Sequence, residues 1–384
     1  MNRFRIPVVA ALCSVGFIAC AADAPRQASS GEVTSDSAKG TAVDLSTTVK
    51  SAPPKAGSGG ASNASPGDKP WSETPATAKA DSINPKLAPG HKPVDQTSFA
   101  AAVRAGVRKE ANWPAPPTIL PGSLLPKNRI VAYYGNPHSK KMGVIGEYPE
   151  QQMLGMWDKT VALWKAADPK TPVIPAIHLV TVVAQGAPGP DGLWVRREDS
   201  SMIERTYKWA KSRNGILFLD IQAANSTLQK ELPRLLPWLS RPEVHLGVDP
   251  EFYMHYEREG LRPSSKIGTM HASDVNYVIQ TLDKLVQEKK LPPKILVVHR
   301  FRRDMVPDPE NIKPTPRVQV VMDMDGWGPP WLKFDSYRDY EVAAPVQFTG
   351  FKIFYHNDTR KNDALLTPLE VLALRPRPLY IQYQ

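Results

Sequence analysis

Cysteine is nearly absent from this chain of 384 residues, which has 2, Cys13 and Cys20, both near the amino terminus. The rest of the chain can therefore form no disulfide framework and no thiolate metal site. No His-x-His or His-Glu-x-x-His pair occurs, so zinc is not expected. No Gly-x-Gly-x-x-Gly follows the first strand-like run, which gives a dinucleotide-binding fold little support. These absences predict a domain without a cofactor or a resident metal.

Acidic residues are fewer than basic ones, 38 against 48, which gives a net charge of +10. No run of Lys and Arg is dense or interleaved with aromatic residues, so nucleic acid is not an expected partner. A basic, soluble surface accounts for the excess, and association with anionic lipid or envelope polymer is the alternative.

The amino terminus has the pattern of an export signal. A short basic segment, 1–5, precedes an apolar stretch, Ile6 to Ala19, which is too short to span a bilayer. Phe17-Ile18-Ala19-Cys20 resembles the bacterial lipobox, with Phe17 in place of the usual Leu. The resemblance implies a signal peptide over 1–20, lipidation of Cys20 and a membrane-anchored lipoprotein at the bacterial cell envelope. Secretion with cleavage after Ala22 or Ala24 is the alternative.

Residues 21–95 are rich in Ala, Ser, Gly, Pro, Thr and Lys, and Trp71 is their only aromatic residue. This composition predicts a disordered tether that holds the domain away from the membrane. Residues 96–126 follow as a helix over Gln96 to Trp113 and an extended Pro-rich segment.

Residues 127–384 alternate apolar strand-like runs with helical patterns. The strand-like runs are 129–135, 173–183, 215–222, 243–252, 294–300, 318–325, 348–356 and 378–384. The helical patterns are 149–167, 197–213, 225–239 and 271–290, with shorter ones near 334–342 and 367–374. Eight such strands predict an α/β fold, a (β/α)8 TIM barrel that ends at its eighth strand. A doubly wound open sheet is the alternative. We expect the helix over 98–112 to cover the missing eighth helix or one end of the barrel.

Polar residues gather at the carboxyl ends of the expected strands, where barrel active sites form. They are Tyr134, His138, Asp220, Gln222, Asp249, Glu251, His299, Arg300, Asp323, Asp325, Tyr355, His356, Tyr380 and Gln382. Asp249 and Glu251 are two residues apart, so on a strand they would share a face. His178 and His245 lie inside apolar runs and are interpreted as core residues.

Clustered carboxyl groups without thiols suit glycoside hydrolysis, which uses two of them. Crowding raises the pKa of one carboxyl group and supplies an acid near neutral pH. We therefore predict catalytic roles for Glu251, Asp249, Asp325 and Asp323. The substrate-binding candidates are Asp220, Gln222, Tyr134, His299, Arg300, Trp327, Tyr355, Tyr380 and Gln382. Trp194, Trp327 and Trp331 lie in loops, where each is either a sugar-stacking residue or a loop anchor.

Two glycosidase families share short motifs with this sequence. Gly247-Val-Asp-Pro-Glu-Phe-Tyr253 is similar to the end of the fourth strand in family eighteen chitinases, of whose Asp-x-x-Asp-x-Asp-x-Glu pattern it matches the last Asp-x-Glu. Met322-Asp-Met-Asp325 is similar to their sixth-strand Met-x-Tyr-Asp, with Met324 in place of the tyrosine, and Ile130-Val-Ala-Tyr-Tyr-Gly135 to their first strand. Ile381-Gln382-Tyr383 resembles the Trp-Gln-Tyr of the last strand in family twenty-five muramidases. The resemblance implies Glu251 as general acid, Asp249 as its partner and Asp325 as a stabilising or orienting group.

Three functions stay open at this point. The first is a glycosidase acting on a polysaccharide or envelope glycan. The second is a non-catalytic lipoprotein that binds glycan or a partner through a degenerate site. The third is a metal-dependent hydrolase using Asp220, Asp249, Glu251, His299 and Asp323, because clustered carboxylates suit hard cations.

Overall fold

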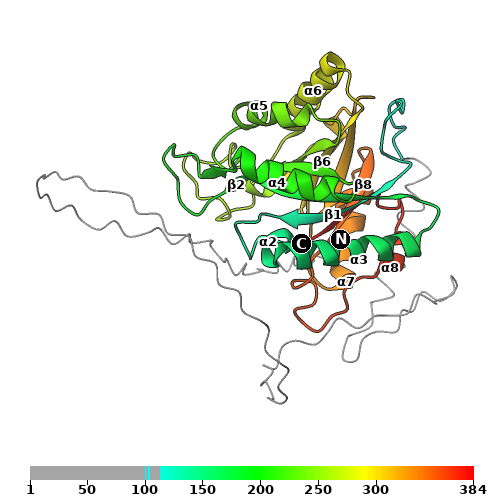
Figure 1. Cartoon of the computed structure of the whole chain (residues 1–384). Helices are drawn as coiled ribbons and strands as arrows, with labels where there is room; N and C mark the ends of the chain where they lie inside the picture. The colour runs from blue at the N-terminus through cyan, green and yellow to red at the C-terminus, as the bar shows by residue number, and fades with distance from the viewer. Residues whose placement is uncertain (1–99, 101–102, 104–112) are drawn as a thin grey trace, which may run out of the picture. The chain divides into compact units, whose positions relative to one another are not determined.

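The computed structural model describes residues 100, 103 and 113–384, which include one closed parallel barrel (Figure 1). Its eight strands are β1 (Arg129–Gly135), β2 (Val173–Ala184), β4 (Ile216–Ile221), β5 (Val244–Val248), β6 (Lys294–Arg300), β7 (Val318–Met324), β8 (Phe348–Ile353) and β9 (Tyr380–Tyr383). Each strand pairs in parallel with the next one along the chain, and β9 pairs with β1 to close the ring. The predicted (β/α)8 TIM barrel is confirmed, and the open sheet is excluded.

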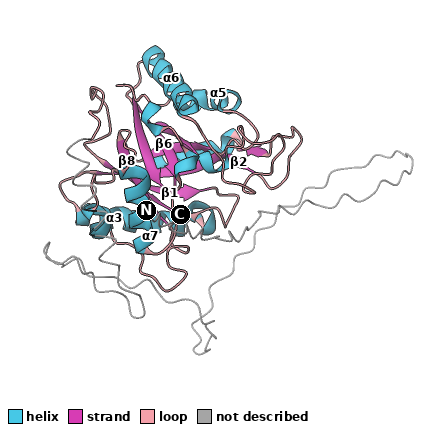
Figure 2. Ribbon diagram, turned by 180° about the vertical axis from the view of Figure 1, so that it is seen from behind, coloured by secondary structure: helices cyan, strands magenta, loops and turns pink. Residues whose placement is uncertain are grey.

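Helices surround the strands, which lie in the middle of the domain (Figure 2). They are α2 (Val144–Glu147), α3 (Glu150–Ala167), α4 (Ser200–Lys211), α5 (Leu228–Leu239), α6 (Ala272–Lys289), α7 (Pro330–Ser336) and α8 (Pro368–Ala373). Two local features differ from the predicted pattern. A short strand, β3 (Val195–Arg197), forms an antiparallel hairpin with the end of β2. The region near 334–342 is α7 followed by a π-helix over Tyr337–Val342.

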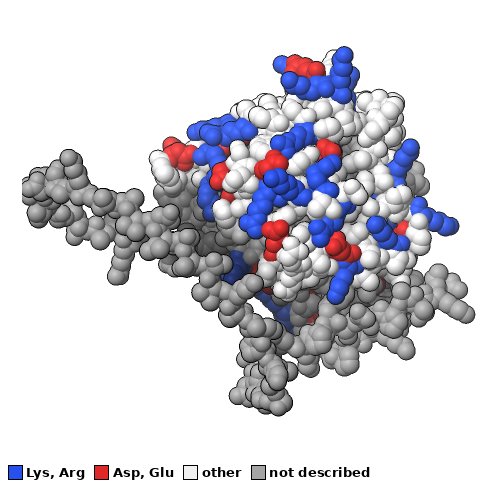
Figure 3. Space-filling view, viewed as in Figure 1, with Lys and Arg blue, Asp and Glu red and all other residues white. Residues whose placement is uncertain are grey.

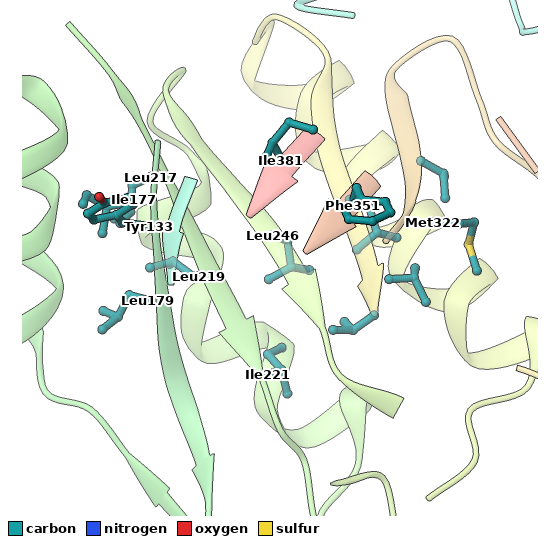
Figure 4. Close-up of a cluster of buried hydrophobic side chains, with 14 of the residues drawn as sticks. Tyr133, Ile177, Leu179, Leu217, Leu219, Ile221, Leu246, Met322, Phe351 and Ile381 are labelled. Atoms are coloured by element: carbon teal, nitrogen blue, oxygen red, sulfur yellow. The ribbon is translucent and has the colours of Figure 1, made fainter. Parts of the chain in front are cut away.

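Side chains that point out from the barrel form the main hydrophobic core between strands and helices. Tyr133, Ile177 and Leu217 come from neighbouring strands and lie together on the side of the barrel that faces a helix (Figure 4). Trp157 and Trp164 of α3 are both fully buried in this layer. The outward face is thus mainly apolar, and the alternate residues of the same strands face the barrel interior.

The amino-terminal end of the barrel interior is filled by apolar side chains and by the Pro-rich segment that precedes β1. Leu125 is fully buried against inward-facing residues such as Ile295 and Val321. The Gln319 side chain accepts a hydrogen bond from Leu125 N (3.1 Å) and donates one to Leu125 O (2.6 Å). Packed side chains therefore close the barrel interior at this end.

Several predictions concern residues outside the described part of the chain. These are the signal peptide over 1–20, the tether over 21–95 and most of the helix proposed over 98–112, of which the structure describes Ala100 and Val103, both helical. Trp113, which follows that segment, donates a hydrogen bond from Nε1 to Gln347 O (2.8 Å). Among the described helices, none combines the length and the apolar character needed to cross a membrane.

Basic residues on the face seen in Figure 3 are scattered and mixed with acidic ones. Several form ion pairs, such as Lys211 with Glu243 (2.6 Å) and Arg241 with Glu204 (2.9 Å). On this face the positive charge is thus distributed rather than gathered into one dense patch.

Candidate active site

Asp249 and Glu251 lie just beyond β5, and the chain turns between them. The strand ends at Val248, and Pro250–Phe252 forms a 3-10 helix, so the expectation that both acids project from one strand face is wrong. Asp249 caps this turn, because its Oδ1 accepts a hydrogen bond from Glu251 N (3.0 Å). Its Oδ2 accepts another from Gln222 Nε2 (3.1 Å). Both oxygens of Asp249 are therefore held, whereas no described residue forms a hydrogen bond with the carboxyl group of Glu251.

The two carboxyl groups favour the protonated form. Burial raises the pKa of Glu251 to about 8, and the negative charges of Asp249 and Asp325 act in the same direction. Burial also raises the pKa of Asp249 to about 7, where the charge of Asp220 adds to the effect and His299 opposes it. Near neutral pH, Glu251 is thus a protonated carboxyl group with an unoccupied hydrogen-bond donor at the mouth of the barrel.

A second group of acids lies at the carboxyl end of β7, two strands along the barrel from β5, next to a lysine from β8. Lys352 Nζ lies 2.9 Å from Asp325 Oδ1, and the lysine side chain is almost completely buried. Asp325 Oδ2 and Asp323 Oδ2 lie 3.4 Å and 3.2 Å from His299 Nδ1. Lys352 Nζ also lies 3.9 Å from the ring centroid of Tyr134, which holds the ring over the interior. The site therefore combines the ion-paired carboxylate of Asp325 with the protonated carboxyl group of Glu251.

Deeper in the barrel, His178, Asp220 and His299 form a fully buried cluster. Asp220 Oδ2 lies 3.5 Å from His178 Nε2 and 3.3 Å from His299 Nε2. Burial lowers the pKa of His178 to about 4, whereas the negative charge of Asp220 outweighs burial and raises the pKa of His299 well above its usual value. The two histidines thus carry different protonation states although they share one carboxylate.

Tyr380 and Gln382 complete the interior from β9. The Tyr380 hydroxyl lies 2.5 Å from His178 Nδ1, and Gln382 Nε2 donates a hydrogen bond to that hydroxyl (2.7 Å). Tyr134 stands above them, with its hydroxyl 3.5 Å from Gln222 Nε2. These residues line the cluster and fix the orientation of the His178 ring.

Two glycines make room for this polar interior. A Cβ on Gly247 of β5 would lie 2.6 Å from His178 Nε2 and 2.7 Å from Asp220 Oδ1. A Cβ on Gly350 of β8 would clash with Asp323 in the same way. Because glycine has no side chain, β5 and β8 leave space in the interior at these two positions, and the polar side chains of neighbouring strands occupy it.

Three candidates from the sequence do not join the cluster. Arg300 points outward and donates hydrogen bonds to Tyr340 O and Val306 O, because successive residues of β6 face opposite sides and His299 faces inward. Tyr355 lies beyond the end of β8, where its hydroxyl contacts those of Tyr133 and Thr160 in the outer layer. Trp327 is 42% exposed, and the Arg360 guanidinium lies over its ring, 5.3 Å from the centroid.

Sequence reasoning overlooked two members of the site. His178 was assigned to the core, and Lys352 was not singled out. Both lie inside apolar strand runs, where a buried charge is costly unless it is paired. That cost was the available signal, because an isolated Lys in an apolar strand implies a nearby acidic partner, here Asp325 at the end of the neighbouring strand.

Comparisons with known proteins leave the family open. No protein-family model matches the chain, and no curated protein matches it. The structure is similar to a crystal structure of a ruminal GH26 endo-beta-1,4-mannanase, at 14% identity and a TM-score of 0.29, over 81% of this chain and 66% of that one. At this TM-score the likeness carries no argument about function, so what can be stated of the chain is its TIM-barrel fold.

Proposed function

We propose that this protein is a glycoside hydrolase in which Glu251 is the general acid. The observation that carries the proposal is the contrast between two sides of the barrel mouth. Glu251 is held protonated by burial and by neighbouring negative charge, and its pKa is raised to about 8. At the end of β7, two strands from β5, Asp325 forms an ion pair with Lys352 (2.9 Å). Glycoside hydrolysis needs this division between one protonated and one ionised carboxyl group.

In the proposed mechanism, Glu251 donates its proton to the oxygen of the departing sugar. Asp249 positions Glu251, because its Oδ1 accepts the hydrogen bond from Glu251 N (3.0 Å). Asp325 supplies the negative charge that stabilises the oxocarbenium-like transition state or activates the attacking group. Asp323 supports it through their shared neighbour His299, which lies 3.2 Å from Asp323 Oδ2.

The proposed substrate is a polysaccharide or envelope glycan. The closed lower end of the barrel and the polar upper end favour a ligand that enters at the carboxyl ends of the strands. Trp327 lies on the loop after β7 and Trp331, 45% exposed, lies in the first turn of α7; both offer apolar ring faces on which a sugar can stack.

The test is reducing-sugar release from chitin, peptidoglycan, soluble β-glucans and β-mannan. The wild-type chain is compared with Glu251→Gln and with Glu259→Gln, an exposed glutamate in the same loop that serves as the control. Loss of a general acid costs about 10²–10⁴-fold in rate, and the control keeps wild-type turnover. Glycan binding without release by the wild type would instead favour a non-catalytic binding protein.

We propose further that Cys20 anchors the protein to a membrane as an exported lipoprotein. The support is the Phe17-Ile-Ala-Cys20 segment after an apolar stretch. In a bacterial host fed labelled palmitate, the wild type and Cys13→Ser are expected to take up label and Cys20→Ser to take up none. Label retained by Cys20→Ser would contradict the assignment.

A further inference from the structure

Three metal-binding atoms converge in the barrel interior below Glu251. They are His178 Nε2, Asp220 Oδ2 and His299 Nε2, and they all lie within 4.8 Å of one another. The residues that carry them are fully buried, and apart from their contacts with one another none of the three atoms has a hydrogen-bond partner within the described part of the chain. Because a buried polar atom is stabilised by partners, a ligand that all three atoms share would satisfy them together.

The spacing of these atoms fits the coordination sphere of a metal ion. Asp220 Oδ2 lies 3.3 Å from His299 Nε2 and 3.5 Å from His178 Nε2. Ligands at about 2.0–2.2 Å from a tetrahedral metal ion are separated from one another by roughly 3.2–3.6 Å. Small movements of side chains therefore suffice to bind an ion between them.

Each of the three residues is also held by its other polar atom. His299 Nδ1 lies 3.2 Å from Asp323 Oδ2, which is the carboxylate–histidine arrangement that turns Nε2 toward a metal. Asp220 Oδ1 accepts a hydrogen bond from Ile221 N (3.0 Å). His178 Nδ1 lies 2.5 Å from the Tyr380 hydroxyl. The outer contacts thus leave one free ligand atom on each residue.

Gln382 is compatible with the same arrangement. Its Nε2 lies 3.2 Å from His178 Nδ1, and its Oε1 has no hydrogen-bond partner among the described residues. A half-turn of the amide would place Oε1 at the position of Nε2, where it would accept from the Tyr380 hydroxyl instead of Nε2 donating to it, and that hydroxyl would then accept the Nδ1–H of His178. That orientation leaves the lone pair of His178 Nε2 available to a metal.

We propose that His178, Asp220 and His299 bind one divalent transition-metal ion of the zinc type inside the barrel. Imidazole and carboxylate donors suit Zn²⁺, Fe²⁺ or Co²⁺ better than Mg²⁺ or Ca²⁺, which prefer oxygen ligands. Gly247 keeps the space open, since a Cβ there would lie 2.6 Å from His178 Nε2. The ion would also offset the excess of carboxyl groups around Lys352.

The sequence motifs had led us to expect no zinc site. Those motifs place two histidines close together on one element, whereas these ligands come from β2, β4 and β6. The proposal is independent of the glycosidase assignment, because it uses neither Glu251 nor Asp249 and its test measures binding rather than turnover.

The test is metal binding by the full chain after dialysis against a chelator. The chain is titrated with Co²⁺, read by visible absorption, and with Zn²⁺, read by equilibrium dialysis, and one ion per chain is expected. In His178→Asn and His299→Asn, the amide of asparagine reaches the position of Nδ1 and keeps a polar group there. The variants have no atom at the position of Nε2, the expected metal ligand. We expect these variants to bind more than ~100-fold more weakly, beyond the ~10–100-fold loss typical of an outer partner such as Asp323→Asn.

The control is His245→Asn, which changes another buried barrel histidine. Its Nδ1 accepts a hydrogen bond from Ile295 N (3.0 Å), which the asparagine oxygen can replace, so binding should not change. X-ray absorption of the Zn²⁺-loaded wild type should show two imidazole ligands, whether or not the variants fold. Less than one ion per chain, a spectrum without imidazole, or equal loss in His245→Asn would overturn the proposal and leave an ion pair between Asp220 and His299.

Discussion

At the scale of single residues, the site depends on how differently two acids of one turn are held. Both oxygens of Asp249 accept hydrogen bonds, from Glu251 N and Gln222 Nε2, which fix its position. Glu251 has a raised pKa of about 8 and no hydrogen bond to its carboxyl group from any described residue. Asp249, which is fixed by two hydrogen bonds, has the property expected of a positioning residue. Glu251, whose carboxyl proton has no acceptor among the described residues, has the property expected of a general acid.

The raised pKa of Glu251 predicts how stability depends on pH. The folded chain keeps this proton up to about pH 8, whereas the unfolded chain releases it near 4.5. Between these values the folded state binds more protons, so its free energy of unfolding falls as pH rises. In Glu251→Gln, the free energy of unfolding should no longer fall with pH through this residue.

The measurement is thermal unfolding of the wild type and Glu251→Gln at about pH 4 and about pH 9. The variant should gain melting temperature relative to the wild type at the higher pH. An equal difference at both values would mean that Glu251 titrates normally, and Glu259→Gln is the control that should show no pH-dependent difference.

Single residues also show how far the site could be predicted. Asp220, Asp249, Asp323 and Asp325 were expected near one another, because carboxyl ends of parallel strands meet at one end of a barrel. The prediction that Arg300 lines the site was wrong. Only alternate residues of a strand face the barrel interior, and on β6 His299 does so. Assigning the inward face requires the register of each strand, which the sequence pattern alone does not fix.

At the scale of elements, the apolar runs predicted all eight barrel strands. The sequence did not predict β3, which forms a hairpin with the end of β2. A strand of 3 residues is too short to show the alternation of apolar and polar side chains. The predicted strand extended too far beyond Val248, the last residue of β5. Asp249-Pro250 begins a turn in which the Asp249 side chain accepts a hydrogen bond from Glu251 N. The end of β5 is thus set by local hydrogen bonding, which the spacing of apolar residues does not reveal.

The inward-facing glycine of β5 gives a prediction at this scale. Gly247→Ala should lower the free energy of unfolding by about 1–3 kcal/mol, because the new Cβ overpacks the interior beside His178 and Asp220. Urea unfolding measures the change.

The control is the same substitution on α3, at Gly155, where an added Cβ meets nothing within 4 Å. There the change should stabilise the helix by about 0.5–1 kcal/mol, because alanine loses less chain entropy than glycine on folding. Effects of the same sign at both positions would contradict the assigned role of Gly247.

At the scale of the whole molecule, the segment before β1 closes one end of the barrel. Leu125 is fully buried there and is held by both ends of the Gln319 amide. Leu125→Ala should therefore lower the free energy of unfolding by about 2–5 kcal/mol. Leu163→Ala on α3, where the leucine is 38% exposed, should cost much less. Equal losses by urea unfolding would show that Leu125 does not close a packed interior.

The whole molecule thus has one closed end and one polar end, and the central claim is that Glu251 at the polar end protonates a leaving group. The most direct measurement compares wild type and Glu251→Gln on a glycan that the wild type cleaves and on its aryl glycoside with an activated phenol. The activated phenol leaves without an acid, so the variant should lose about 10²–10⁴-fold on the glycan and far less on the aryl glycoside. Equal losses on both substrates, or no cleavage of any glycan by a folded wild type, would contradict the account.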